Sequence, residues 1–325
     1  MKRFRRIVPA ATLVLLMLVL ATLWLQRVRL MDWLAQRGYT ASASVVTLAA
    51  DDTMTADARH LFFVNRPVID QAAAFNKACT NKTEKDVVLG CYHGDRQGIY
   101  LYDVTDPRLH GVEQVTAAHE MLHQAYDRLS AKERTRINGL LETYAKDGLT
   151  DQRIKDKLDA YKQSEPSALD TEMHSIFGTE VRNLPPALEQ YYARYFTDRS
   201  KIIAFSDGYQ AELASRQQQV AAYDQQLKML ATQIDANKAT LDTQLSKLSQ
   251  QKGAADRAAA QHDAAAYQAA AVSYNRMVST YNQLVDTTKA QIDQYNTIVG
   301  ERNAIAVEQE QLQQALDSQA QPLNQ

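Results

Sequence analysis

The sequence is organised around the stretch Val115-Thr116-Ala117-Ala118-His119-Glu120-Met121-Leu122-His123-Gln124-Ala125-Tyr126. Histidines four positions apart leave an α-helix from the same face, so the imidazoles of His119 and His123 can bind one divalent ion. Glu120 lies on the adjoining face, where its carboxylate can accept a proton from a water molecule at that ion. The surrounding residues are small or apolar, which indicates a buried helix. The stretch therefore predicts a metal site; the alternative is two core histidines bonded to backbone groups.

This pattern resembles the His-Glu-x-x-His motif of the zincin metallopeptidases. Residues 98–104 precede it, are rich in aromatic and β-branched residues, and end just before the turn signal Asp106-Pro107. They predict a strand. In zincins an edge strand lies beside the active-site helix and holds extended substrate, so the resemblance implies that role for residues 98–104.

A catalytic zinc site has three protein ligands and an open position for water. One class of zincins takes the third ligand from His-Glu-x-x-His-x-x-Gly-x-x-His, which requires glycine at position 126 and histidine at 129. This chain has Tyr126 and Leu129 instead, so that class is excluded. A glutamate from a later helix is the remaining source.

Residues 168–179 resemble the ligand helix of the glutamate-zincins, the thermolysin-like class, with Glu172 at the ligand position and the helix ending at Gly178. Glu180 is the alternative ligand. The thermolysin-like helix carries an aspartate four residues after the ligand, where this chain has Ile176. The support for the metal-binding histidines is therefore expected from Asp170, from Glu180 or from a backbone carbonyl.

The resemblance implies Zn²⁺ held by His119, His123 and Glu172, with Glu120 as the general base that hydrolyses a peptide bond. A donor to the oxyanion is usual in such sites. The compositional candidates, which could equally form the packed face of a helix, are Tyr191, Tyr192, Arg194 and Tyr195. His174 lies about 200° around the helix from Glu172 and is expected to be structural or to face the substrate.

Residues 7–25 form a run of 19 residues without a charge, long enough to span a bilayer as a helix. Four basic residues precede the run and two follow it closely, which predicts a cytoplasmic N-terminus. We therefore expect a single-pass membrane anchor, with all residues after 30 on the extracellular or periplasmic side. A cleaved signal peptide is the alternative.

The chain has two cysteines, Cys79 and Cys91. In an oxidising compartment this pair favours a disulfide that closes a loop of about a dozen residues. Two buried thiols are the alternative.

From residue 187 to 321 the chain lacks proline, and its large apolar residues recur at spacings of three, four and seven. This spacing predicts two long helices. Gly253 interrupts the pattern and favours an antiparallel coiled-coil hairpin with its turn near residues 251–256. The alternative is one continuous helix in a parallel homodimeric coiled coil. We expect the hairpin to bind a protein partner or to self-associate.

Together these observations predict an α+β fold with four parts: a transmembrane anchor (1–29), a linker (30–44), a zincin-like metallopeptidase domain (45–198) and the coiled-coil hairpin (199–320). Strand-like runs at residues 44–49 and 60–64 contribute to the expected sheet. The net charge of −2 and the lack of a basic stripe make nucleic acid an unexpected partner.

The predicted function is that of a membrane-anchored, externally facing zinc metallopeptidase acting on a peptide or protein substrate. The alternatives are a non-catalytic cell-envelope scaffold that acts through its coiled coil, and a hydrolase of cell-wall peptide bonds.

Overall fold

The computed structural model describes residues 15–17, 22, 26–79, 88–94 and 96–319. The chain divides into two compact units. The first comprises Met1–Glu212 and Leu312–Gln325, and the second is Leu213–Gln311. The first unit carries the His-Glu-x-x-His stretch, and the second consists of two helical arms.

The first unit combines a small sheet with short and medium helices. Its elements, before the long helix α11 begins, are α2 (Arg27–Gln36), α3 (Ala43–Asp51), α4 (Ala56–Val64), β1 (Val68–Asp70), α5 (Ala72–Ala78), β2 (Gly90–His93), β3 (Gly98–Tyr102), the 3-10 helix η1 (Pro107–Leu109), α6 (Val112–Asp127), α7 (Ala131–Asp147), α8 (Gln152–Ser164), α9 (Leu169–Glu180) and α10 (Pro186–Tyr192).

The sheet has the order β1-β3-β2, with β1 parallel and β2 antiparallel to β3. Residues 98–102 therefore form the central strand. The prediction of an edge strand at residues 98–104 is wrong, because β1 and β2 cover both of its edges. Ile99 and Leu101 of β3 are fully buried, as expected for alternate residues of a strand with one face in the core. The strand at the sheet edge that lines the functional site is β2.

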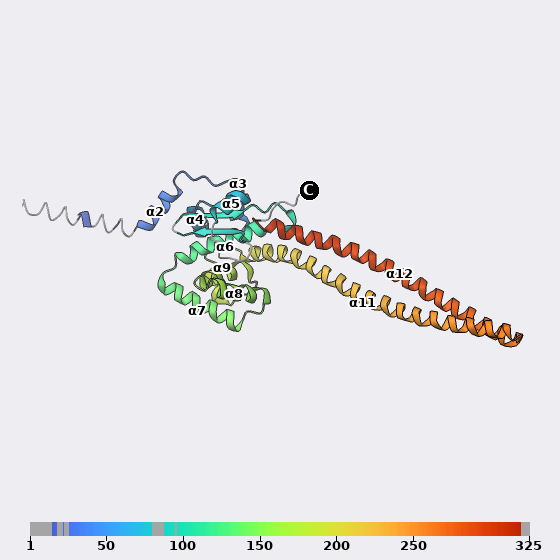
Figure 1. Ribbon diagram of the computed structural model, residues 1–325. Helices are drawn as coiled ribbons and strands as arrows, with labels where there is room; N and C mark the ends of the chain where they lie inside the picture. Colours follow the sequence, from blue (N-terminus) through green and yellow to red (C-terminus); the bar gives the residue numbers. More distant parts are fainter. Residues whose placement is uncertain (1–14, 18–21, 23–25, 80–87, 95, 320–325) are drawn as a thin grey trace, which may run out of the picture. The chain divides into compact units, whose positions relative to one another are not determined.

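Helix α6 lies between the sheet and helices α7 to α9 (Figure 1). Its residues Met121 and Leu122 are fully buried. Each side chain of this kind contributes about 1.5–3 kcal/mol when removed from water. The small and apolar residues of this helix, from which burial was predicted, are explained by its contacts on more than one side.

The predicted α+β fold class is wrong, because the described residues are predominantly helical and the sheet is small. The runs at 44–49 and 60–64, predicted as strands, lie in helices α3 and α4. The Ser42 side chain accepts a hydrogen bond from Val45 N, and the Thr55 side chain accepts one from Ala58 N. These N-caps satisfy amides that the start of a helix leaves unpaired, and they outweigh the weak strand preference of a few β-branched residues.

The structure also corrects the prediction of an N-terminal transmembrane helix. Most of residues 7–25 lies outside the described residues, and no described helix is both long and apolar enough to cross a membrane. The first helix described over its full length, α2, has 10 residues. It therefore extends about 15 Å, roughly half of the hydrocarbon core of a bilayer.

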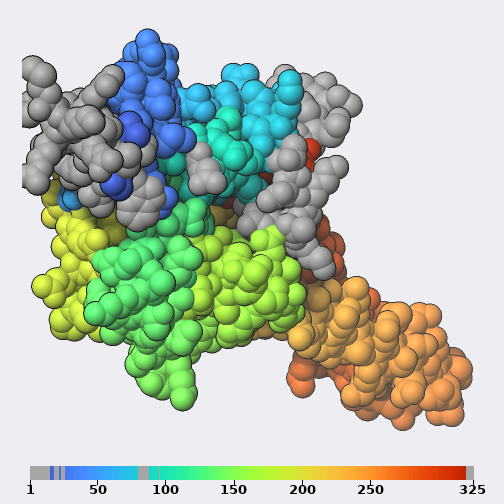
Figure 2. Space-filling view, turned by 90° about the vertical axis from the view of Figure 1, so that its left-hand side faces the viewer, coloured from blue at the N-terminus to red at the C-terminus, as the bar shows by residue number. Residues whose placement is uncertain are grey.

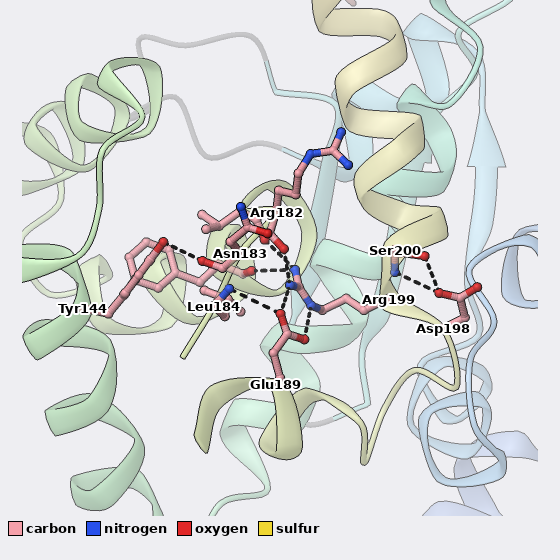
Figure 3. A network of polar contacts seen from close by, with 10 residues as sticks. Tyr144, Arg182, Asn183, Leu184, Glu189, Asp198, Arg199 and Ser200 are labelled. Carbon is pink, nitrogen blue, oxygen red and sulfur yellow. Dashed lines mark hydrogen bonds and ion pairs between the residues drawn. The ribbon is translucent and has the colours of Figure 1, made fainter. Parts of the chain in front are cut away.

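The start of α11 is tied to the end of α9 by the guanidinium of Arg199 (Figure 3). This buried side chain donates to the carbonyl oxygen of Val181 at 2.7 Å and to that of Arg182 at 3.0 Å. It also pairs with Glu189 of α10. A cation at a helix C-terminus satisfies carbonyl groups that have no partner within the helix. Arg199 thereby fixes the end of the helix that carries Glu172.

The second unit contains most of α11 (Arg199–Ala260) and α12 (Ala264–Leu316). The two helices are antiparallel, since cross-links between them pair late α12 residues with early α11 residues: Arg216 with Glu308, Asp224 with Arg302, and Asn237 with Gln291. The continuous single helix, the alternative considered from the sequence, is not observed.

The turn of this hairpin lies at residues 261–263, and not near 251–256 as predicted. Gly253 lies inside α11, where a single glycine costs only about 1 kcal/mol relative to alanine. The helix ends where His262 adopts a positive φ of 56°. Asp263 then begins α12 by accepting a hydrogen bond from Ala266 N at 3.0 Å.

Gly178 of α9 should be essential to the packing of α9 on α6. A Cβ atom at this position would lie 2.4 Å from Leu122 Cδ1 and 2.8 Å from Tyr192 Cε1. We predict that Gly178→Ala lowers the free energy of unfolding by about 1–2 kcal/mol, because overpacking outweighs the gain in helix propensity.

Gly139→Ala in α7 is the matched control, because a Cβ atom there meets nothing within 4 Å. It should raise the free energy of unfolding by about 0.5–1 kcal/mol. Urea denaturation of both variants measures the two effects, and a stabilising Gly178→Ala would contradict the packing described above.

Candidate metal centre

Helices α6 and α9 bring His119, His123 and Glu172 together. The two histidines lie one turn apart on α6, and their ring centroids are 4.8 Å apart. Glu172 comes from the first turn of α9 and is 7% exposed. The sequence-predicted ligands from separate segments therefore share one site in the first unit.

The distances between these groups have the values expected for ligands of one small ion. His119 Nε2 lies 3.3 Å from Glu172 Oε2, and His123 Nε2 lies 3.4 Å from Glu172 Oε1. Two ligand atoms at about 2.0–2.1 Å from a tetrahedral zinc are about 3.3–3.4 Å apart. Glu172 Oε2 is buried and has no hydrogen-bond partner among the residues that the structure describes. An orphaned carboxylate oxygen facing two imidazole nitrogens fits a cation held among them.

Electrostatics favour the protonation states that a metal requires at two of the three groups, His123 and Glu172. Burial lowers the pKa of His123 to about 4, so this imidazole is neutral at pH 7. Burial raises the pKa of Glu172, but the nearby histidines and a hydrogen bond from Tyr161 outweigh it and bring the pKa to about 2. Burial also lowers the pKa of His119, but the adjacent carboxylate of Glu172 outweighs it and leaves the pKa raised, so a cation competes with a proton at this imidazole. An anionic carboxylate beside a neutral imidazole is a suitable ligand set.

Glu120 also belongs to this group, since single ligand atoms of His119, Glu120 and His123 lie within 4.8 Å of one another. Strand β2 approaches Glu120 closely. A Cβ atom at Gly90 would lie 2.5 Å from Thr116 Cγ2 and 2.8 Å from Glu120 Oε1. Only glycine leaves room for this approach, so Gly90 sets the distance between strand β2 and the carboxylate.

The contacts that orient His123 differ from those predicted. Its Nδ1 lies 2.9 Å from Thr171 Oγ1 and 3.4 Å from Ser175 Oγ. We assign Nδ1–H as the donor, because Nε2 then keeps its lone pair towards Glu172. Asp170 instead accepts a hydrogen bond from Asn138. Hydroxyl groups thus take the place of the carboxylate that Ile176 replaces.

The ring of Tyr92 in β2 lies parallel to that of His123. Their ring centroids are 6.4 Å apart and the rings are nearly parallel, at 7°. The Tyr92 hydroxyl donates to Asp127 Oδ2 at 3.0 Å. Tyr92 cannot be identified from the sequence, because strand composition alone does not show which side chains meet a neighbouring helix.

His174 is structural. It is fully buried, its Nε2 lies 2.8 Å from the Tyr191 hydroxyl, and burial lowers its pKa to about 3. The hydroxyl of Tyr192 donates to the His174 carbonyl at 2.6 Å. None of the four residues considered as oxyanion donors lines the cavity at the metal centre, namely Tyr191, Tyr192, Arg194 and Tyr195.

The histidines and Glu172 line a cavity of about 440 Å³. Its walls include strand β2 and one face of α8. Helices α7 and α8 lie side by side on the surface of the first unit (Figure 2). Residues Lys157, Tyr161 and Glu165 line the cavity at successive spacings of four, so they share one face of the chain as it leaves α8. The sequence pattern alone does not identify this wall, because a spacing of four does not show which helix face meets the cavity.

Cys79 and Cys91 form a disulfide, which confirms the predicted bridge. The bond joins the end of α5 to β2, and both cysteines line the cavity. Most of the loop that it closes, residues 80–87, lies outside the described residues. The bridge restrains the strand that carries Tyr92 and Gly90.

Glu180, the alternative third ligand, is engaged elsewhere. Lys157 Nζ lies 2.8 Å from Glu180 Oε1, and Arg153 Nη1 lies 2.5 Å from Glu180 Oε2. Burial raises the pKa of Glu180, but these two cations outweigh it and lower the pKa to about 2. Because both oxygens already have cationic partners, Glu172 is the better placed ligand.

Comparison of the chain with protein-family models, with curated proteins and with solved structures returned no match. We therefore infer the function from the geometry of the site.

The ion pairs of Glu180 predict a specific pH dependence of stability. A carboxyl group whose folded pKa is depressed contributes its full stabilisation above its unfolded pKa of about 4.5 and loses it as the pH falls towards 2. We predict that the gap in unfolding free energy between wild type and Glu180→Gln narrows by about 2–3 kcal/mol between pH 6 and pH 2.5.

Thermal and urea unfolding across this pH range measure the gap, with Glu142→Gln, an exposed glutamate of α7, as the control for loss of a carboxylate. A gap that stays constant down to pH 2.5 would contradict the assigned ion pairs.

Proposed function

We propose that the chain is a zinc-dependent metallopeptidase of the glutamate-ligand zincin type. The observation that carries the proposal is the meeting of two imidazole Nε2 atoms with one buried carboxylate at 3.3 and 3.4 Å. The donor set of two histidines and one glutamate is typical of a catalytic zinc site. His119, His123 and Glu172 would hold the metal, which supplies polarisation of the scissile carbonyl and a lowered pKa of water.

Glu120 acts as the proton carrier. Its carboxylate takes the proton from the attacking water and delivers it to the amine that leaves. The close approach of Gly90 limits the positions that the Glu120 side chain can adopt. A restrained general base is useful because proton transfer requires hydrogen-bond distance to the reacting water.

Strand β2 and helix α8 provide the walls between which a peptide would bind. Strand β2 pairs with β3 along one edge, and no described strand pairs with its other edge. An open strand edge can hold an extended chain by backbone hydrogen bonds. The disulfide between Cys79 and Cys91 supports action in an oxidising compartment.

The proposal predicts separate effects on metal binding and on turnover. His119→Ala and Glu172→Ala should lose zinc, because each removes a ligand. Glu120→Gln should keep stoichiometric zinc and reduce kcat/KM for peptide cleavage by about 10²–10⁴-fold, the usual contribution of a general base. Metal analysis by mass spectrometry and cleavage of a peptide library, including cell-wall peptides, measure the two properties.

Glu142→Gln should match the wild type in both assays. Full zinc affinity in Glu172→Ala would overturn the third ligand, and undiminished cleavage by Glu120→Gln would overturn the general base. Stoichiometric zinc in a wild type that cleaves no peptide would instead favour a non-catalytic binding protein acting through its helical hairpin.

A further inference from the structure

The cavity at the metal centre has different charges on its two sides along α8. Tyr161, in the middle of the wall, hydrogen-bonds Glu172 and so lies at the metal centre. Lys157 is four residues before it and Glu165 four residues after it. At 1.5 Å per residue, Lys157 is displaced by about 6 Å along the helix axis towards the start of α8, and Glu165, the residue that caps the end of α8, lies in the opposite direction. A bound substrate therefore meets a cation on one side of the reacting bond and an anion on the other.

Lys157 is distinguished from the other residues of the wall by its charge and its surroundings. Among the described residues that line this cavity, it is the one lysine or arginine. Its side chain is 35% exposed, and within the described part of the chain its ammonium donates one hydrogen bond, to Glu180 Oε1 at 2.8 Å. An ammonium group carries three N–H donors. Lys157 can therefore hold Glu180 and still donate to a ligand in the cavity.

Glu180 orients Lys157 without neutralising this part of the site. Its second oxygen pairs with Arg153 at 2.5 Å, so two cations share one buried carboxylate. Glu180 is 5% exposed, and a buried anion fixes the lysine side chain more firmly than a solvated one would. The arrangement presents a pre-oriented positive charge to the cavity, with little rotamer entropy left to lose on binding.

We propose that Lys157 determines substrate preference by binding a carboxylate of the peptide, about one helical turn from the metal centre. The inference rests on the proposed peptidase function. The carboxylate is either the C-terminus of a short peptide or the side chain of an aspartate or glutamate near the scissile bond. Glu165, on the opposite side of the centre, repels the same group, so the pair of charges also sets the direction in which the peptide lies.

The test uses one peptide cleaved by the zinc-loaded full chain and prepared in four forms. These combine a free or amidated C-terminus with glutamate or glutamine beside the scissile bond. We expect the wild type to prefer a carboxylate form over its neutral counterpart by about tenfold in kcat/KM, mainly through KM, because a charge-assisted hydrogen bond at a half-exposed site has this order of strength. If amidation of the C-terminus lowers kcat/KM, Lys157 binds the terminal carboxylate. If replacement of glutamate by glutamine lowers it, Lys157 binds the side-chain carboxylate.

In Lys157→Met, the ratio of kcat/KM between the carboxylate form and its neutral counterpart should fall to about one. In Lys157→Arg, most of the tenfold preference should remain. Lys162→Met is the control, since Lys162 lies on α8, is exposed and pairs only with Asp159 among the described residues. Zinc content and thermal unfolding of each variant show whether the fold is intact, and the Lys157→Arg result decides the role of the charge if Lys157→Met is unstable.

Equal cleavage of all four forms by the wild type, or an undiminished preference in Lys157→Met, would overturn the role of Lys157 and leave the peptidase proposal standing. Absence of cleavage of every form by a zinc-loaded wild type would overturn the peptidase proposal, and this inference with it.

Discussion

The structure of the first unit depends on the close packing of α9 against α6. Gly178 allows this contact, since a side chain at that position would collide with Leu122 and Tyr192. The contact places Glu172 against two histidines and buries three polar groups together. Such burial is costly unless the groups are paired or hold an ion. Tyr161 hydrogen-bonds this carboxylate, but among the described residues Glu172 Oε2 has no hydrogen-bond partner, so protein contacts satisfy the group only in part. A metal ion bound there would remove this cost, so the fold and the proposed chemistry depend on the same contact.

Further contacts fix the positions of α6 and α9 relative to the other residues of the site. Arg199 binds the carbonyl groups at the end of α9. Thr171, near the start of α9, contacts the ring of His123 and fixes its orientation. On the other side, the disulfide and Gly90 bring β2 up to Glu120. Pre-oriented ligands and a restrained base lower the reorganisation that a reaction requires. The surrounding helices therefore matter to function because they hold a few side chains at fixed distances.

The part of this site that could be predicted from sequence is the part encoded by local spacing. His119, Glu120 and His123 follow from helical periodicity, and Glu172 follows from a resemblance in a second helix. The contacts of Lys157 and Thr171 depend on how separate helices pack, which no local pattern records. The prediction of strands at 44–49 and 60–64 is wrong, because the N-caps Ser42 and Thr55 stabilise helices in those segments. The prediction of a turn near Gly253 is wrong, because a long helix tolerates one glycine.

The central claim is that His119, His123 and Glu172 hold one zinc ion. The most direct measurement is a crystal structure of the zinc-loaded protein with anomalous diffraction data collected at the zinc absorption edge. We predict a single strong anomalous peak about 2.0–2.2 Å from His119 Nε2, from His123 Nε2 and from one Glu172 oxygen, with a fourth position open to the cavity. A peak coordinated by Glu180 in place of Glu172, or no peak at these residues, would contradict it.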